Sequence, residues 1–261
     1  MARSLIPNTT WARRLIYELI YLSFGLNRTG MFNVGFAPAR PDIRANPAFA
    51  DRPNQIQLYA EMFDRLPWEA DRWRRSDCLE LAAGCGGGLL YLNTHRAPRT
   101  SIGVEQSNVA VWRARRLGVD VRQGHVARLA FEDEQFDCVF CADAVGYFPV
   151  AAALNEAFRV MRPGGYLLLA ESFHGSREAA RNHFHRIGEA AGFDLLDCHD
   201  ATDGVRRSLV EGGKRSSFVQ RLPGALRDSL KETLFLEGSE RLRLWQTGAY
   251  SFVIVTFRRP P

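Results

Sequence analysis

The chain has 261 residues, of which 46% are hydrophobic and 24% charged, so it is long enough to bury a sizeable core in one elaborated domain. Its net charge of +5 is small and is spread along the chain without a block of Lys and Arg, which argues against a nucleic-acid partner. Five cysteines without framework spacing favour a reducing, cytoplasmic setting.

Residues 1–70 are expected to form a helical cap or lid, and 71–261 the main domain. An apolar helix is predicted over 13–26, but it is too short to span a bilayer and carries Glu18 in its middle. No small-residue cleavage site follows it, so a signal peptide is not expected. Two interpretations stay open: a helix packed on the core, which is favoured, and a peripheral membrane contact.

Strand and helix patterns alternate from Cys78 onward. Strands are predicted at 78–82, 101–105, 119–124, 136–143, 165–172, 193–198 and 249–259, and helices at 88–95, 107–117, 151–161 and 177–193. Such alternation indicates a mostly parallel, doubly wound α/β sheet. A turn is expected at Arg162–Gly165, and a polar helical insertion at 201–240 is expected to shape the pocket at the carboxyl edge of the strands.

Cys138 and Cys141 form a CxxC within the predicted strand FDCVFCAD. Residues three apart on a strand point to opposite faces, so the two thiols are not expected to share a metal ion. His183 and His185, two apart on a helix, also make a poor metal pair. No metal site is predicted.

The stretch LELAAGCGGG, Leu79–Gly88, lies between a predicted strand and a predicted helix, where ligands bind in such sheets. The dinucleotide pattern GxGxxG fails because position 89 is Leu, and no GK[ST] follows. The loop is therefore a poor pyrophosphate cradle, although it allows close backbone approach. Glu105, at the end of the next strand, can accept both hydroxyls of a ribose. A nucleoside cofactor without a diphosphate, S-adenosyl-L-methionine, suits this pattern, since acidic and aromatic surroundings favour its sulfonium cation.

The runs LELAAGCGGG, GVEQS, FEDEQFDCVF and EAFRVMRPGGYLLLAE resemble the class I S-adenosylmethionine-dependent methyltransferases, over about residues 78–172. The flanks MFNVGFAP, QIQLYAEMF and GAYSFVIVTF are similar to a bacterial subgroup that includes phthiotriolone and phenolphthiotriolone methyltransferases and macrolide and sugar O-methyltransferases. The resemblance implies a Rossmann-like, seven-stranded sheet with an antiparallel final strand.

The resemblance also implies roles for individual residues. Glu80 matches the acid that places the methionine part of the cofactor, Glu105 matches the ribose-binding acid, and Gln106 follows it beside the adenine. The loop backbone is expected to pass along the cofactor at Ala82, Gly84 and Gly86, with Ala82 standing where many members have a glycine. Motifs that lie over the cofactor in related enzymes are matched by Phe32, Asn33, Phe36 and Tyr59.

His125 stands where subgroup members usually carry the Asp that bonds the adenine amine. A neutral imidazole can accept that hydrogen bond and a protonated one cannot, so cofactor affinity is expected to fall as His125 gains a proton. In the alternative, the backbone of Val126 carries the adenine and His125 faces outward. The two interpretations are evenly weighted.

The histidine that commonly follows the fourth strand in the lipid O-methyltransferases is Gly146 here. Methyl transfer is an in-line displacement, and an alcohol acceptor must also lose a proton. Three residues are candidates for catalysis, each with an ordinary structural alternative: Asp143, Tyr147 and His174. An acceptor that is already deprotonated or acidic needs no base.

The predicted function is O-methylation of a hydrophobic small molecule, such as a lipid, polyketide or terpenoid, in bacterial secondary or lipid metabolism. Phe32, Asn33 and Phe36 are the candidate acceptor contacts. Two alternatives are a cyclase or eliminase that uses bound S-adenosylmethionine without transferring its methyl group, and a binding protein without catalysis. A monomer or homodimer is expected.

Overall fold

The computed structural model describes residues 18, 21, 33–212, 224, 231–232 and 238–261. The predicted helix at 13–26 lies outside the described residues apart from Glu18 and Tyr21, as do Phe32 and most of 213–237.

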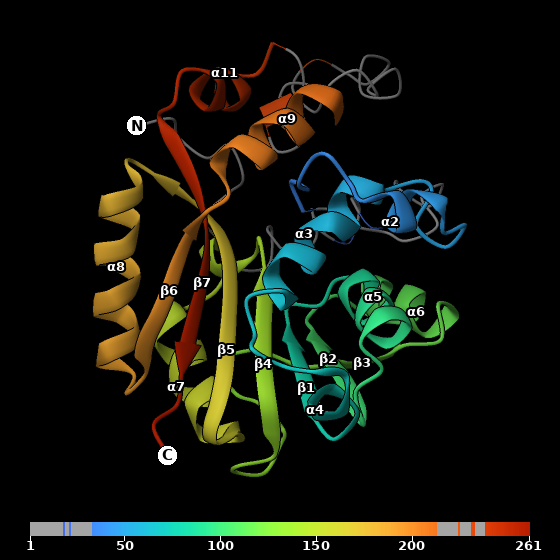
Figure 1. Ribbon diagram of the computed structural model, residues 1–261, viewed down its shortest axis with the longest axis vertical. Coiled ribbons are helices and arrows are strands. Elements are labelled where there is room, and N and C mark those ends of the chain that lie inside the picture. Colours follow the sequence, from blue (N-terminus) through green and yellow to red (C-terminus); the bar gives the residue numbers. More distant parts are fainter. Residues whose placement is uncertain (1–17, 19–20, 22–32, 213–223, 225–230, 233–237) are drawn as a thin grey trace.

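Seven strands form one twisted sheet with the order β3-β2-β1-β4-β5-β7-β6 (Figure 1). The strands are β1 Asp77–Leu81, β2 Thr100–Glu105, β3 Asp120–Gln123, β4 Phe136–Ala142, β5 Met161–His174, β6 Asp194–Asp200 and β7 Tyr250–Arg258. β7 runs antiparallel to both of its neighbours, β5 and β6, and the other pairs are parallel. The predicted α/β class, with an antiparallel final strand, is confirmed.

Helices cover both faces of the sheet (Figure 1). The helices are α2 Pro41–Ala45, α3 Pro53–Phe63, α4 Ala70–Arg74, α5 Gly87–His95, α6 Asn108–Arg116, α7 Val150–Val160, α8 Arg177–Ala190, α9 Thr202–Gly212 and α11 Glu240–Gln246, with a 3-10 turn η1 at Val145–Tyr147. Buried side chains of α3, α5 and α6 form one apolar cluster with the sheet, and those of α7 and α8 form the other. Cys138 belongs to the first cluster and Cys141 to the second, so the two thiols do lie on opposite faces.

The turn signal at Arg162–Gly165 follows the end of α7 at Val160, as predicted, but these residues lie inside β5, which already pairs with β4 at Met161. The register then jumps from Phe136↔Met161 to Cys138↔Tyr166, so the intervening residues make a bulge rather than a separating turn. Gly164 supplies the positive φ of 76° that this bulge needs.

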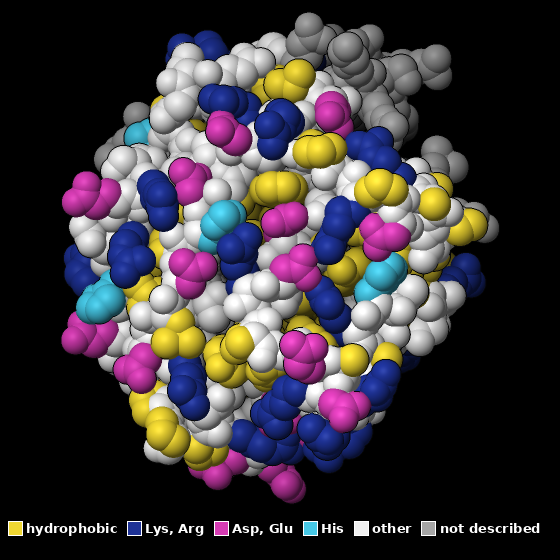
Figure 2. All heavy atoms as spheres, viewed as in Figure 1, with side chains coloured by type: hydrophobic (Ala, Val, Ile, Leu, Met, Phe, Trp, Pro, Cys, Tyr) yellow, Lys and Arg dark blue, Asp and Glu magenta, His cyan; other side chains and the backbone are white. Residues whose placement is uncertain are grey.

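The carboxyl ends of β1, β2, β4 and β5 meet at one edge of the sheet, which is the upper edge in Figure 1. Helix α9, which lies in the insertion 201–240, and helix α11, which begins at its last residue, both lie above that edge. Among the described helices, none combines the length and the apolar character that crossing a membrane requires. The face seen in Figure 2 carries basic and acidic side chains mixed together.

Candidate functional site

The glycine loop, residues 82–86, leaves β1 in a tight turn at the carboxyl edge. The Ala83 amide donates to the Val104 carbonyl at 3.0 Å, and the Gly86 amide donates to Ala83 at 2.9 Å. Gly84 and Gly86 have φ of 54° and 79°, values that glycine adopts without a steric penalty. Ala82 has φ of 53° and takes the same left-handed conformation with a side chain. The loop therefore exposes backbone rather than side chains to a ligand.

Glu80 is buried behind this loop, near the end of β1. The Tyr59 hydroxyl of α3 donates to Glu80 Oε1 at 2.9 Å, while the buried Oε2 has no hydrogen-bond partner among the described residues. Burial raises the pKa of Glu80 to about 8, against the opposing hydrogen bond from Tyr59. A buried carboxyl oxygen without a partner is costly, so a ligand that brings a positive charge or donor here would be held firmly.

Gly88 is part of the same arrangement. A Cβ at this position would lie 2.4 Å from Glu80 Oε1 and 2.4 Å from the Tyr59 ring. Gly88, the last glycine of the stretch Leu79–Gly88, is therefore required by the close approach of α5 to the Tyr59–Glu80 pair, and not by a phosphate.

Glu105 ends β2 and turns back over the glycine loop. Its Oε2 accepts the Gly84 amide at 2.9 Å and its Oε1 accepts the Ser107 amide at 2.8 Å. Burial raises the pKa of Glu105, although these amides oppose the shift. Each carboxylate oxygen has a second lone pair, so the oriented group retains the capacity to accept two ribose hydroxyls. The next residue, Gln106, is exposed at the same edge.

Two residues of the N-terminal part reach this edge. The Glu18 carboxylate accepts from the Ser107 hydroxyl at 2.7 Å and from the Asn108 and Val109 amides at 3.0 and 3.1 Å, at the start of α6. A Cβ added at Gly84 would lie 3.3 Å from the Tyr21 hydroxyl. Sequence reasoning missed both contacts, because each joins residues that are far apart in the chain, 89 positions for Glu18 and Ser107, and so leaves no local pattern.

His125 and Val126 follow β3 in the loop expected to hold the adenine. His125 is exposed, and its Nδ1 accepts the Ala127 amide at 3.1 Å. Val126 is buried within the cluster under α7 and α8. The outward-facing interpretation of His125 matches this geometry, and which residue holds the adenine stays a prediction.

The three candidate catalytic residues lie around the ends of β4 and β5. Asp143 directly follows β4 and is half-buried, with its Oδ2 accepting the Val34 amide at 2.9 Å. Tyr147 ends η1 and is 51% exposed. His174 ends β5, exposed, with its ring edge-on to Tyr250 at 5.1 Å between centroids. Of the three, Asp143 is the half-buried one, whereas Tyr147 and His174 are exposed.

Residues 33–36, here called the strap, cross above the end of β4. The Asn33 amide group donates to Gln55 of α3 at 3.3 Å, and the Val34 carbonyl accepts from Ser208 of α9 at 2.9 Å. The Phe36 ring packs against α9 at Gly204, where a Cβ would lie 2.2 Å from it. The strap therefore places candidate acceptor contacts, Asn33 and Phe36, between α3 and α9 and beside Asp143.

Glu171 is the acid that sequence reasoning missed at this edge. It lies near the end of β5, and its Oε2 accepts the Val145 amide of η1 at 2.7 Å. An acid close to the carboxyl end of a strand was a signal available in the sequence, since the same reasoning selected Glu105.

These residues fit a nucleoside cofactor with a cationic amino-acid tail. Glu105 keeps lone pairs that could accept ribose hydroxyls, the glycine loop would let a ligand approach the backbone, and the orphaned Oε2 of Glu80 would suit an ammonium group.

Comparison with known proteins agrees with this geometry. Residues 81–169 match the family model described as a methyltransferase domain. A probable S-adenosylmethionine-dependent methyltransferase of Mycolicibacterium smegmatis is 30% identical over 194 residues, covering 68% of this chain and 74% of that protein. The phthiotriol/phenolphthiotriol dimycocerosates methyltransferase of Mycobacterium tuberculosis is 28% identical over 217 residues, covering 80% of this chain and 78% of its own.

Solved structures share the fold at lower identity. The [4+2]-cyclase SpnF has a TM-score of 0.72 and 18% identity, with 97% of each chain covered. A geranyl diphosphate C-methyltransferase from Streptomyces coelicolor, in complex with Mg²⁺, geranyl diphosphate and S-adenosyl-L-homocysteine, has a TM-score of 0.69 and 12% identity, covering 97% of this chain and 100% of that one.

Proposed function

The chain belongs to the S-adenosylmethionine-dependent methyltransferases, with S-adenosyl-L-methionine as its cofactor, and we propose that it methylates a hydroxyl group of a hydrophobic small molecule. The relatives support this class of acceptor, because one is named for phthiotriol and phenolphthiotriol dimycocerosates and a structural neighbour holds geranyl diphosphate. Lipid, polyketide and terpenoid alcohols or phenols of bacterial secondary metabolism are therefore the acceptors to test.

The observation that carries the proposal is Asp143. A half-buried carboxyl group at the end of β4, next to the strap, is suited to take a proton from a hydroxyl acceptor. The bound cofactor supplies an electrophilic methyl carbon on a sulfonium. The chain's own tasks are to orient the cofactor through Glu80 and Glu105, to align the acceptor in line with the C–S bond, and to accept the hydroxyl proton.

The strap supports a hydrophobic acceptor. Phe36 is partly buried and adds an aromatic surface beside α9. The Asn33 side chain already bonds the Gln55 carbonyl and the Gly35 amide, and we propose that its remaining N–H and lone pair meet a polar part of the acceptor. We also propose that residues 1–70 act as the cap of the site and that the insertion 201–240 closes its other side.

The test is transfer of a labelled methyl group from S-adenosylmethionine to a panel of hydrophobic alcohols, phenols and carboxylic acids. We expect a labelled ether product that the Asp143→Asn variant forms at least tenfold more slowly, with unchanged cofactor affinity by calorimetry. The Glu105→Ala variant is the matched control, because it should lose cofactor binding itself. Labelled ester from carboxylic acids alone would reject a hydroxyl acceptor.

The alternatives predict different results. A cyclase or eliminase that retains the methyl group would release no labelled product, and would bind S-adenosylmethionine at least as tightly as S-adenosylhomocysteine. A binding protein without catalysis would also leave the label on the cofactor, and it would leave every acceptor in the panel unchanged.

A further inference from the structure

Two carboxyl groups occupy matching places on adjacent parallel strands. β4 and β5 pair in register up to Ala142↔Ala170, so Asp143 and Glu171 are the next residues on the two strands. The Asp143 amide donates to the Ala170 carbonyl at 2.7 Å, which keeps the two chains together at that point. The register of the sheet therefore sets one acid beside the other at the edge where the acceptor is expected.

The two carboxyl groups differ in the donors that they receive. Glu171 accepts the amides of Val145, Gly146 and Ser172 at 2.7, 3.3 and 3.0 Å, and the Ser172 hydroxyl at 3.1 Å. Asp143 accepts the Val34 amide at 2.9 Å. Donors directed at a carboxyl group stabilise its ionised form, so Glu171 is the better place for a negative charge.

Burial, followed by the charge of Glu171, raises the pKa of Asp143 well above its usual range. Burial also raises the pKa of Glu171, but its amide donors oppose that shift. Among the described residues, Arg241 of α11 and Cys141 of β4 also interact electrostatically with Asp143, and Arg241 works in the opposite direction. The charge of Glu171 therefore favours the protonated form of Asp143.

The backbone holds Asp143 in one orientation. Its φ of 55° lies in the left-handed region, where an aspartate is uncommon but tolerated. The strap fixes the side chain from above through the Val34 amide. A residue with this backbone conformation, held by both the strap and β5, is a pattern found at functional sites.

From this juxtaposition we infer that Glu171 is a positioning residue that makes Asp143 the proton acceptor of the transfer reaction. The inference rests on the proposed function. In the step, the acceptor oxygen forms its bond to the methyl carbon as the C–S bond breaks, and that electron pair remains on sulfur. The hydroxyl proton goes to Asp143 in the ionised fraction of the protein, and the high proton affinity of that carboxylate makes it a stronger base than an ordinary aspartate.

The test follows the titration of Asp143 by NMR in protein labelled with ¹³C at its Asp carboxyl carbons, with S-adenosylhomocysteine added. The Asp143→Asn variant assigns the signal. In the Glu171→Gln variant we expect the Asp143 midpoint to fall by at least one pH unit, a tenfold loss of proton affinity. An unchanged midpoint, or an ordinary aspartate midpoint in the wild type, would overturn the inference.

A second variant separates the charge of Glu171 from its support of η1. Glu171→Asp keeps a negative charge with a shorter side chain, so the Asp143 midpoint should stay raised even if the turn loosens. A fall equal to that in Glu171→Gln would assign the effect to turn structure and reject the electrostatic role.

The methyl-transfer panel keeps the two proposals apart. If the Asp143 titration midpoint is raised and depends on Glu171 but no labelled ether forms, O-methylation is rejected and the electrostatic coupling of the two carboxyl groups is supported. If the ether forms but the Asp143 midpoint is that of an ordinary aspartate, the role of Glu171 is rejected and the proposed O-methylation is supported. If both hold, the pH profile of kcat should move to lower pH in Glu171→Gln by the shift that NMR measures.

Discussion

Ala82 shows how a single residue can depart from a family pattern at an energetic cost. Its φ of 53° places an L side chain in the left-handed region, and this strain costs roughly 1–2 kcal/mol. A glycine would remove the strain, but it would lose about 0.5–1 kcal/mol more backbone entropy than alanine on folding. We therefore expect Ala82→Gly to raise the free energy of unfolding by up to about 1 kcal/mol, as measured by urea denaturation.

Ala83 is the matched control for this change. It is buried, its Cβ contacts the sheet near Gly103, and its φ is not positive. Ala83→Gly should therefore lower the free energy of unfolding by roughly 0.5–1 kcal/mol or more. Equal losses in the two variants would show that the backbone at Ala82 is not strained.

Glu80 links cofactor binding to pH. Burial raises its pKa to about 8, so the carboxyl group is mostly protonated at pH 7 in the ligand-free protein. A cofactor ammonium beside Oε2 would favour the ionised form and lower that pKa. Binding at pH 7 should therefore release a proton, and affinity should increase with pH up to about 8 and then level off.

Calorimetric titration with S-adenosylhomocysteine in buffers of different ionisation enthalpy measures this release. The Glu80→Gln variant keeps the shape of the side chain and cannot titrate, so its binding should be weaker and the release should disappear. Proton release that persists in Glu80→Gln would assign the linkage to another group, with Glu105 the next candidate.

At the scale of elements, the strap is fitted closely between α3 and α9. Gly35 has φ of 73°, and a Cβ there would lie 2.5 Å from the Ser208 hydroxyl and 3.0 Å from the Asn54 carbonyl carbon. Gly118 has a similar φ of 75° with nothing within 4 Å of its Cβ position. Alanine at either position carries the same backbone strain, and only Gly35→Ala adds a clash.

We therefore expect Gly35→Ala to displace the strap, and Gly118→Ala to leave it in place. Hydrogen exchange should be faster in Gly35→Ala at the Val34 amide, which donates to Asp143, and unchanged there in Gly118→Ala. Cofactor affinity should be the same in both variants, since Glu80 and Glu105 do not depend on Gly35. Equal exchange rates in the two variants would contradict a tightly seated strap.

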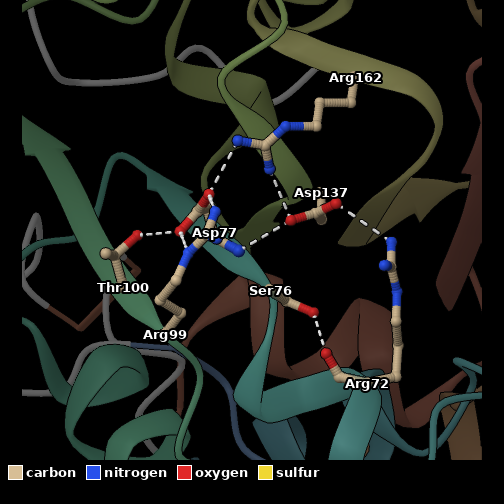
Figure 3. Close-up of polar contacts among 7 residues, drawn as sticks. All are labelled: Arg72, Ser76, Asp77, Arg99, Thr100, Asp137 and Arg162. Atoms are coloured by element: carbon tan, nitrogen blue, oxygen red, sulfur yellow. Dashed lines mark hydrogen bonds and ion pairs between the residues drawn. The ribbon is translucent and has the colours of Figure 1, made fainter.

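At the scale of the whole molecule, an ion-pair network joins the strands at the edge opposite the site (Figure 3). Arg162 reaches Asp77 with one terminal nitrogen at 2.8 Å and Asp137 with the other at 2.6 Å. Arg99, just before β2, also pairs with Asp77, and Arg72, in the last turn of α4, pairs with Asp137. Figure 2 shows basic side chains gathered on this lower part of the visible face.

The network makes a prediction for acid stability. Although burial opposes the change, hydrogen bonds from Arg99, Thr100 and Arg162 lower the pKa of Asp77 from 3.8 to about 2. A lowered pKa in the folded state adds stability above pH 3.8, and that stability is lost as the pH falls towards 2. Arg162→Lys cannot bridge both aspartates with one ammonium group and should cost about 1–3 kcal/mol at pH 7.

Arg243→Lys is the control, because Arg243 and Glu240 form an exposed pair on α11. Its cost should be below about 0.5 kcal/mol. Urea denaturation at pH 7 and pH 3 would measure both variants, and the cost of Arg162→Lys should shrink at the lower pH. A cost that does not change with pH would assign the role of Arg162 to packing.

The sequence by itself determined the class of fold, the family and the cofactor. Strand and helix periodicity, the loop Leu79–Gly88 and an acid at the end of the next strand are local patterns, and each can be recognised within about ten residues. Element boundaries were close, apart from the bulge at the start of β5, where pairing with β4 overrode a turn signal.

Only the tertiary structure decided which groups meet. Asp143 and Val34 are 109 positions apart, Val34 and Ser208 are 174 apart, and Glu171 lies beside Asp143 because two strands share a register. Gly88 must be a glycine because Tyr59, on another helix, leaves no room for a Cβ at that position. The physical reason is that hydrogen bonds and the fields of buried charges act across space, whereas sequence patterns report only the periodicity of neighbouring residues.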